Sequence, residues 1–311
     1  AFFMLTMALA TLMSIVMFDA KVSLSGDDCD YILAADAFWH HFTFPGHHGS
    51  LYPIVLSPFV GLFGYRLVLL KFLSVLFTVG AFGFLYKAFE RRIPSAVLIP
   101  SMLLAAICSY IFFYAGYTYS EPLFMLLQSI YFYFFSRYFW VEGGTPSYTL
   151  RKDWKKYLTL GALTLAMGLT REIGFCVIGV VILYFAIKGR WKDLLYTVGA
   201  ALLMLAAFYL VKAILWPNVA AGHSFTNLKD YYTPKAGMED PAGLLSRFWD
   251  NSRVYLSAFL CQMMGVMPET PSNRFDMSAT RTLIIYGLYF AALVVVLIRR
   301  DAPLLFAGLY A

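Results

Sequence analysis

Long apolar stretches alternate with short polar ones along almost the whole chain. A helix that spans a bilayer needs about 20 mostly apolar residues, and the pattern predicts eight such helices and a truncated ninth that begins near Ala302. The predicted spans are 1–20, 66–89, 95–115, 122–141, 158–170, 173–187, 194–215 and 282–298. The pattern therefore predicts an all-α protein, a polytopic transmembrane helix bundle.

Composition and charge fit a membrane protein. Of the 311 residues, 60% are hydrophobic and only 14% are charged, which is too few for a soluble surface. The net charge of +6 comes from short basic clusters between apolar stretches and not from an arginine-rich arm, so nucleic acid is not an expected partner. Because both chain ends lie in apolar stretches, we expect residues 1–311 to be a fragment with one transmembrane domain.

The basic clusters also predict the orientation. Lys and Arg in short loops mark the cytoplasmic side of a membrane protein, and here they follow the second, fourth, sixth and eighth predicted spans. Two long polar stretches, 21–65 and 216–281, then face outward. We therefore expect an integral, multi-pass protein whose chemistry is outside, away from ATP and nucleotide sugars.

The fifth and sixth predicted spans, 158–170 and 173–187, are each too short to cross about 30 Å of hydrocarbon. Arg171 and Glu172 lie between them. An ionised side chain inside the membrane costs about 2.5–3.5 kcal/mol unless it faces water or a partner. These two residues therefore predict a polar cavity, with a structural ion pair to a neighbouring helix as the alternative for Arg171.

The first outer stretch begins with carboxylates and continues as an amphipathic helix. Tyr31, Ala34 and Phe38 share one helical face, so we expect this helix to lie along the membrane surface. Asp27 and Asp28 at its start suit helix capping. They also suit a base that takes a proton from an acceptor hydroxyl or amine as it attacks a sugar carbon.

Cations are needed if a phosphate is the group that leaves the sugar. Arg171 is the buried candidate, and Arg66 and Lys71 in the outer half of the second span are the others. Glu121, between Ser120 and Pro122, is either an ordinary first-turn acid, with Ser120 as the helix cap, or an acid that lines the same site.

Histidines and cysteines give weaker signals. His40, His41, His47 and His48 crowd into the first outer stretch, but their spacing matches no strong metal pattern, so no cofactor is assigned and a divalent metal is not favoured. His47 and His48 are instead predicted to line the cavity. Cys29 and Cys261 are both on the outer side, where a disulfide between them is permitted.

Several short segments occur in an order that resembles a known family. They are Gly26-Asp27-Asp28, Ser50-Leu51-Tyr52-Pro53, Tyr119-Ser120-Glu121-Pro122 and Gly168-Leu169-Thr170-Arg171-Glu172. On this topology they resemble the GT-C superfamily of integral membrane glycosyltransferases, in particular the family-39 branch that is similar to protein-mannosyltransferases and aminoarabinose transferases.

The resemblance implies a GT-C-type bundle and a glycosyltransferase of the bacterial inner membrane. Its donor would be a polyprenyl- or dolichyl-phosphate sugar, and its acceptor a glycan, a lipid or a protein. Asp27 or Asp28 would be the base, the anomeric carbon would be inverted, and Tyr52 would line the cavity. Aminoarabinose-type relatives often carry an acidic–basic pair where this chain has His47 and His48, and this departure leaves the ligand of the donor phosphate open.

Two other functions fit the same features. A transporter or lipid flippase would use the intramembrane charges along a path and not at a reaction centre. A non-catalytic subunit with a degenerate GT-C fold would keep the bundle without the reaction.

Overall fold

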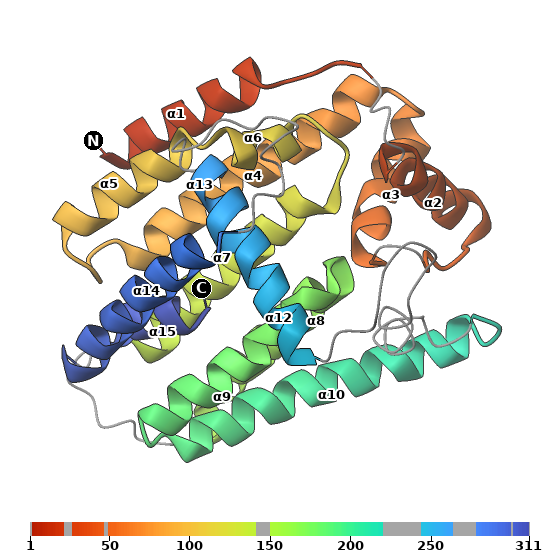
Figure 1. Ribbon diagram of the computed structural model, residues 1–311. Helices are drawn as coiled ribbons and strands as arrows, with labels where there is room; N and C mark the ends of the chain where they lie inside the picture. Colours follow the sequence, from red (N-terminus) through yellow and green to blue (C-terminus); the bar gives the residue numbers. More distant parts are fainter. Residues whose placement is uncertain are drawn as a thin grey trace. The chain divides into compact units, whose positions relative to one another are not determined.

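The computed structural model describes residues 2–21, 27–46, 49–140, 150–219, 244–263, 278–299 and 301–310. No strand occurs among these residues, and the predicted all-α fold is confirmed (Figure 1). The chain divides into two compact units, Ala1–Val219 with Ala302–Ala311, and Ala220–Asp301. That the two units make a single transmembrane domain stays a prediction.

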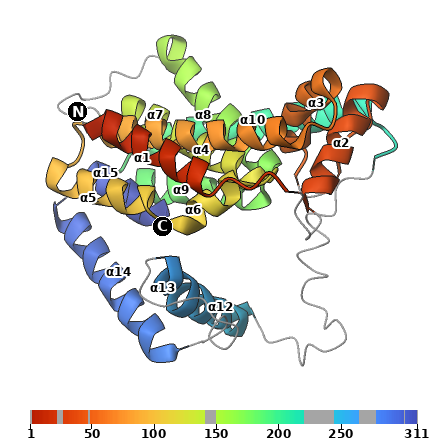
Figure 2. The same ribbon diagram turned by 90° about the horizontal axis from the view of Figure 1, so that it is seen from above.

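The first unit contains most of the helices (Figures 1 and 2). They are α1 (Phe2–Val16), α2 (Asp27–His41), α3 (Leu51–Phe63), α4 (Leu67–Phe89), α5 (Ser95–Ala106), α6 (Ser109–Ala115), α7 (Ser120–Phe139), α8 (Leu150–Thr170), the 3₁₀-helix η1 (Glu172–Cys176), α9 (Val177–Ile187), α10 (Trp191–Leu215) and α15 (Ala302–Tyr310).

Three helices among the described residues are long and apolar enough to cross a membrane. They are α4, α10 and, in the second unit, α14 (Ala279–Arg299). Helices α5 and α6, which are bent by 53° at a short break, make a fourth if the pair counts as one span. These helices are compatible with a membrane protein. The remaining predicted spans are helical as well, but that all eight cross the bilayer stays a prediction, and so does the orientation.

Two helices differ from the sequence-based expectation. The predicted span 158–170 is wrong at its start, because α8 begins at Leu150 and has 21 residues, enough for about 30 Å. Its first turns carry Lys155 and Lys156, which hydropathy alone assigns to a loop. Helix α3 lies inside the stretch 21–65, which was predicted as a polar outer loop, and it has Pro58 in its interior. Helix α2 occupies the expected place; its contact with the membrane surface stays a prediction.

Helices α4 and α7 make the most extensive helix–helix contact of the first unit. Helices α1, α5 and α6 pack against α4, while α8 packs against α7 and α10 against α8. Helix α15 enters the unit through Phe306, which is fully buried with its ring 3.9 Å from that of Phe135. In lipid, such contacts stabilise mainly through close packing, because the tails are as apolar as the side chains.

A polar cluster fixes the C-terminal end of α7. The Asp193 carboxylate is fully buried and accepts bonds from the Arg190 Nε–H at 2.7 Å and the Tyr157 hydroxyl at 2.6 Å. Arg190 also donates to the carbonyl of Phe139, and Arg92 donates to that of Trp140. Arg92 and Arg190 belong to the basic clusters that follow the second and sixth predicted spans. Both therefore lie at the same end of α7, roughly 28 Å along that helix from Ser120.

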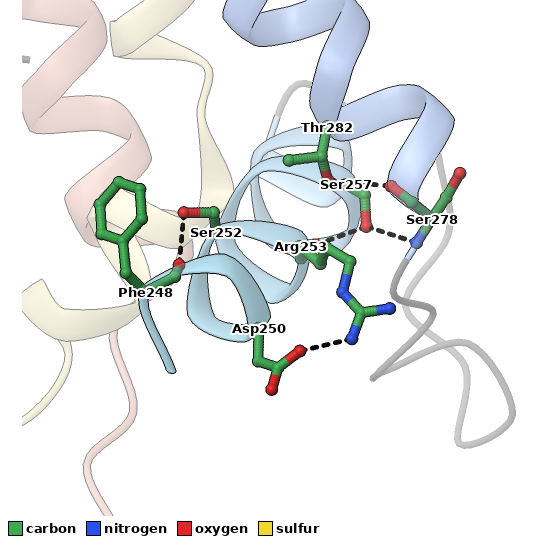
Figure 3. Close-up of polar contacts among 7 residues, drawn as sticks. All are labelled: Phe248, Asp250, Ser252, Arg253, Ser257, Ser278 and Thr282. Atoms are coloured by element: carbon green, nitrogen blue, oxygen red, sulfur yellow. Dashed lines mark hydrogen bonds and ion pairs between the residues drawn. The ribbon is translucent and has the colours of Figure 1, made fainter. Parts of the chain in front are cut away.

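The second unit has two helical segments joined by hydroxyl groups. The first is α12 (Leu244–Ser252), the π-helix η2 (Arg253–Phe259) and α13 (Leu260–Met263), and the second is α14. Figure 3 shows Ser257 between them, donating to the carbonyl of Arg253 at 2.5 Å and accepting from the Ser278 N–H at 3.0 Å. The stretch 216–281, predicted as a polar stretch that faces outward, thus contains helix from Leu244 to Met263.

Candidate functional site

The two aspartates at the start of α2 have different surroundings. Asp28 is buried, and its carboxylate accepts the backbone N–H of Thr118 at 2.6 Å, which ties α2 to the segment before α7. Asp27, one residue earlier, is exposed. A base must reach its substrate, so Asp27 has the access that Asp28 lacks, and Asp28 is suited to positioning.

The Ser120 hydroxyl joins three helices at one point. It accepts a hydrogen bond from the Tyr31 hydroxyl of α2 at 3.0 Å, and a longer one from the Arg171 guanidinium at the end of α8, at 3.4 Å. Arg171 also forms an ion pair of 2.5 Å with Glu121 in the first turn of α7. Residues that are about 50 and 90 positions apart in the chain therefore meet here.

The pKa of the Tyr31 hydroxyl depends on its burial and on the charged groups nearby. Burial raises the pKa of its hydroxyl above the ordinary value. The bond to Ser120 and the positive charge of Arg171 act in the opposite direction, while Glu121 and Asp27 act with burial. Asp27 lies one helical turn before Tyr31 on α2, while Arg171 contacts both Glu121 and Ser120. Two acids and a guanidinium therefore lie in the same part of the fold as this hydroxyl.

Gly49 brings the end of α8 to this place. Its φ of +93° is a conformation that other residues rarely adopt, and a Cβ here would lie 2.2 Å from the carbonyl oxygen of Thr170. Thr170 immediately precedes Arg171, whose extended backbone ends α8. The close approach of the segment before α3 therefore sets where the guanidinium lies.

We expect Gly49→Ala to destabilise the protein by about 1–3 kcal/mol from the backbone conformation alone, with a further cost from the contact with Thr170. The matched control is Gly46→Ala, where an added Cβ meets nothing within 4 Å and φ is not positive; it should stay within about 0.5 kcal/mol of wild type. Thermal unfolding in detergent measures both. Equal midpoints for the two variants would contradict the assigned contact.

Tyr52 is fully buried on α3, with its ring 5.0 Å from that of Tyr31 in an edge-to-face arrangement. Its hydroxyl lies near that of Ser74 on α4, but within the described part of the chain neither makes a hydrogen bond of acceptable geometry. That Tyr52 lines a cavity stays a prediction.

Removal of the Tyr52 hydroxyl should cost little, because an unbonded buried hydroxyl stabilises nothing. We expect Tyr52→Phe to leave the thermal midpoint unchanged or raise it. Tyr31→Phe, the control from the same ring pair, loses the bond to Ser120 and should cost about 1 kcal/mol. If Tyr52→Phe is the more damaging variant, its hydroxyl has a partner such as an ordered water molecule.

Other predicted phosphate and cavity residues have varied positions. The Lys71 ammonium is buried and donates to the carbonyls of Asp19, at 2.8 Å, and Lys21, so it holds the segment after α1. Arg66, just before α4, and Glu172, at the start of η1, are exposed. His47 and His48 lie outside the described residues. The role of each in binding phosphate or lining a cavity stays a prediction.

Sequence reasoning missed the part that Ser120 plays. Ser120 was predicted as the cap of α7, but Tyr119 is the cap residue and the Ser120 hydroxyl bonds to Tyr31 and Arg171 instead. Its place beside Glu121 and Pro122 was the only local signal. No spacing rule links it to residues on two other helices.

Among the described residues, no three His, Cys, Asp or Glu side chains lie close enough to hold a metal ion. That the site works without a metal stays a prediction. No cysteine within either unit is bonded to another in the described part of the chain. Cys29 and Cys261 belong to different units, so the bridge between them stays a prediction.

Comparisons of the chain with family models, with curated proteins and with solved structures found no significant match.

Proposed function

We propose that this chain is the membrane portion of a glycosyltransferase of the GT-C type, which moves a sugar from a polyprenyl-phosphate donor to an acceptor at the outer membrane face. The observation that carries the proposal is the contact of Arg171 with Glu121 and Ser120, whose hydroxyl bonds to Tyr31, with the exposed Asp27 one helical turn before Tyr31 on α2. Such a transfer needs an acid that takes the proton of the acceptor and a cation that stabilises the departing phosphate, and an exposed acid and a guanidinium can supply them.

Asp27 is the proposed base. The acceptor hydroxyl or amine attacks the anomeric carbon and forms the new bond while its proton passes to the Asp27 carboxylate. The bond from the anomeric carbon to the phosphate oxygen breaks, and its electron pair leaves with the polyprenyl phosphate. Attack from the side opposite the phosphate inverts the anomeric carbon, in line with the family that the sequence resembles.

Arg171 is the proposed ligand of the departing phosphate. Its side chain is about 40% exposed, so an incoming anion can reach it. A planar guanidinium can donate two parallel bonds to phosphate oxygens, which suits charge that builds up as the bond breaks. Buried Asp28 and the Ser120 hydroxyl support this arrangement by fixing the start of α2 and the start of α7.

A transfer assay tests the proposal. Purified protein in lipid nanodiscs is incubated with a panel of polyprenyl monophosphate sugars and with candidate lipid, glycan and peptide acceptors, and products are detected by mass spectrometry. We expect at least one donor to lose its sugar in a protein-dependent way. Movement of intact donor across a vesicle membrane without any transfer would instead favour a flippase.

A further inference from the structure

Arg171 already has an anionic partner in the protein without ligands. The Glu121 carboxylate contacts its guanidinium at 2.5 Å, and the two side chains are about 25% and 40% exposed. The pair joins the first turn of α7 to the end of α8. Ser120, bonded to the same guanidinium nitrogen, connects the pair to Tyr31.

This pairing bears directly on phosphate binding. Glu121 and Ser120 both contact Nη1 of the guanidinium, so a phosphate that binds through Nη1 has to displace Glu121. A phosphate on the other N–H groups would still be repelled by the Glu121 carboxylate, because the two anions would share one cation. Phosphate and Glu121 therefore compete for Arg171.

We infer that the Glu121 carboxylate occupies the place of the lipid phosphate on Arg171, so that a polyprenyl phosphate binds by exchange with Glu121 and leaves when Glu121 returns. This inference rests on the proposed function of the same site. The donor is a phosphodiester with one negative charge, whereas the released polyprenyl phosphate is a monoester whose charge approaches two. A competing carboxylate is most useful against the monoester, because it opposes retention of the product.

The test measures binding of a short-chain polyprenyl monophosphate to the purified protein in nanodiscs. Glu121→Gln keeps the size of the side chain and removes its charge, so we expect the probe to bind about three- to ten-fold tighter than to wild type, the range set by a partly exposed ion pair. A gain in affinity cannot come from misfolding. Glu121→Ala serves as a second variant and should also bind more tightly.

Two comparison variants separate exchange from a general effect of charge. Glu172→Gln removes one negative charge beside Arg171 and keeps the ion pair between Arg171 and Glu121. Glu90→Gln breaks an exposed ion pair between Glu90 and Lys87 at the C-terminal end of α4. Both should change the affinity by less than Glu121→Gln does. An equal gain with Glu172→Gln, no gain with Glu121→Gln, or no binding of the probe to any variant overturns the inference.

The outcomes for the inference and for the proposed function remain distinct. If the probe binds wild type and tightens with Glu121→Gln while no donor loses its sugar, the exchange stands and the transferase proposal fails. If transfer occurs but Glu121→Gln binds the product no more tightly, the transferase stands and the exchange fails. Where the exchange stands, Arg171→Gln should weaken binding of the probe, because it removes the guanidinium that holds the phosphate.

Discussion

Asp27→Asn is expected to lower the rate constant for sugar transfer by about two orders of magnitude or more, since general-base catalysis contributes roughly 10²–10⁴-fold. The asparagine side chain keeps the size and exposure of Asp27 but cannot take the acceptor's proton. Donor binding should change little, because the proposed phosphate ligand is Arg171. Single-turnover transfer with saturating donor separates the chemical step from binding.

Asp30→Asn is the matched control for this experiment. Asp30 is exposed and lies in the same first turn of α2 as Asp27. Both substitutions remove one negative charge that interacts with the helix dipole, worth about 0.3–1 kcal/mol, so they should lower stability similarly. Transfer by the Asp30 variant should stay within about three-fold of wild type. Equal rates for the two variants would show that the acids of α2 act only on the helix.

Arg190→Ala is expected to have the largest effect on stability, a loss of about 3–5 kcal/mol. Asp193 is fully buried, and Arg190→Ala removes a cation that lies 2.7 Å from its carboxylate. Removing a partner from a buried charge is far more costly than losing an exposed ion pair. Thermal unfolding in detergent or in nanodiscs measures the change.

Arg137→Ala is the control for the Arg190 variant. Arg137 is exposed near the same end of α7, where it donates to the Tyr133 hydroxyl, and its removal should cost less than about 1 kcal/mol. The double variant Arg190→Ala/Asp193→Asn also removes the buried negative charge and should be more stable than Arg190→Ala alone. A double variant that is no better would contradict the view that a buried charge causes the loss.

The helices were predictable where apolar length is the dominant signal. Helices α4 and α10 follow the predicted spans closely, since few polar residues interrupt them. Helix α8 was cut short because its first turns carry Lys155 and Lys156, and hydropathy does not distinguish a charged helix end from a loop. Helix α3 was missed because its 13 residues are too few for a membrane span, and span length was the signal used to predict helices.

The residues of the candidate site were predictable only as separate acids and bases. Arg171 and Glu121 were both singled out, but nothing in their local sequences pairs them. Their contact depends on Gly49 against Thr170 and on the packing of α8 on α7. The bond of Thr118 to Asp28 likewise depends on how the segment before α7 meets α2. Such contacts arise from the tertiary fold, which a residue pattern does not contain.

The most direct test of the central claim is an electron cryomicroscopy structure of the protein with a polyprenyl phosphate bound. The account predicts phosphate density on the Arg171 guanidinium, with Glu121 displaced and the Asp27 carboxylate on the same side as the phosphate. Phosphate held elsewhere, or Asp27 facing a different compartment from Arg171, would contradict it.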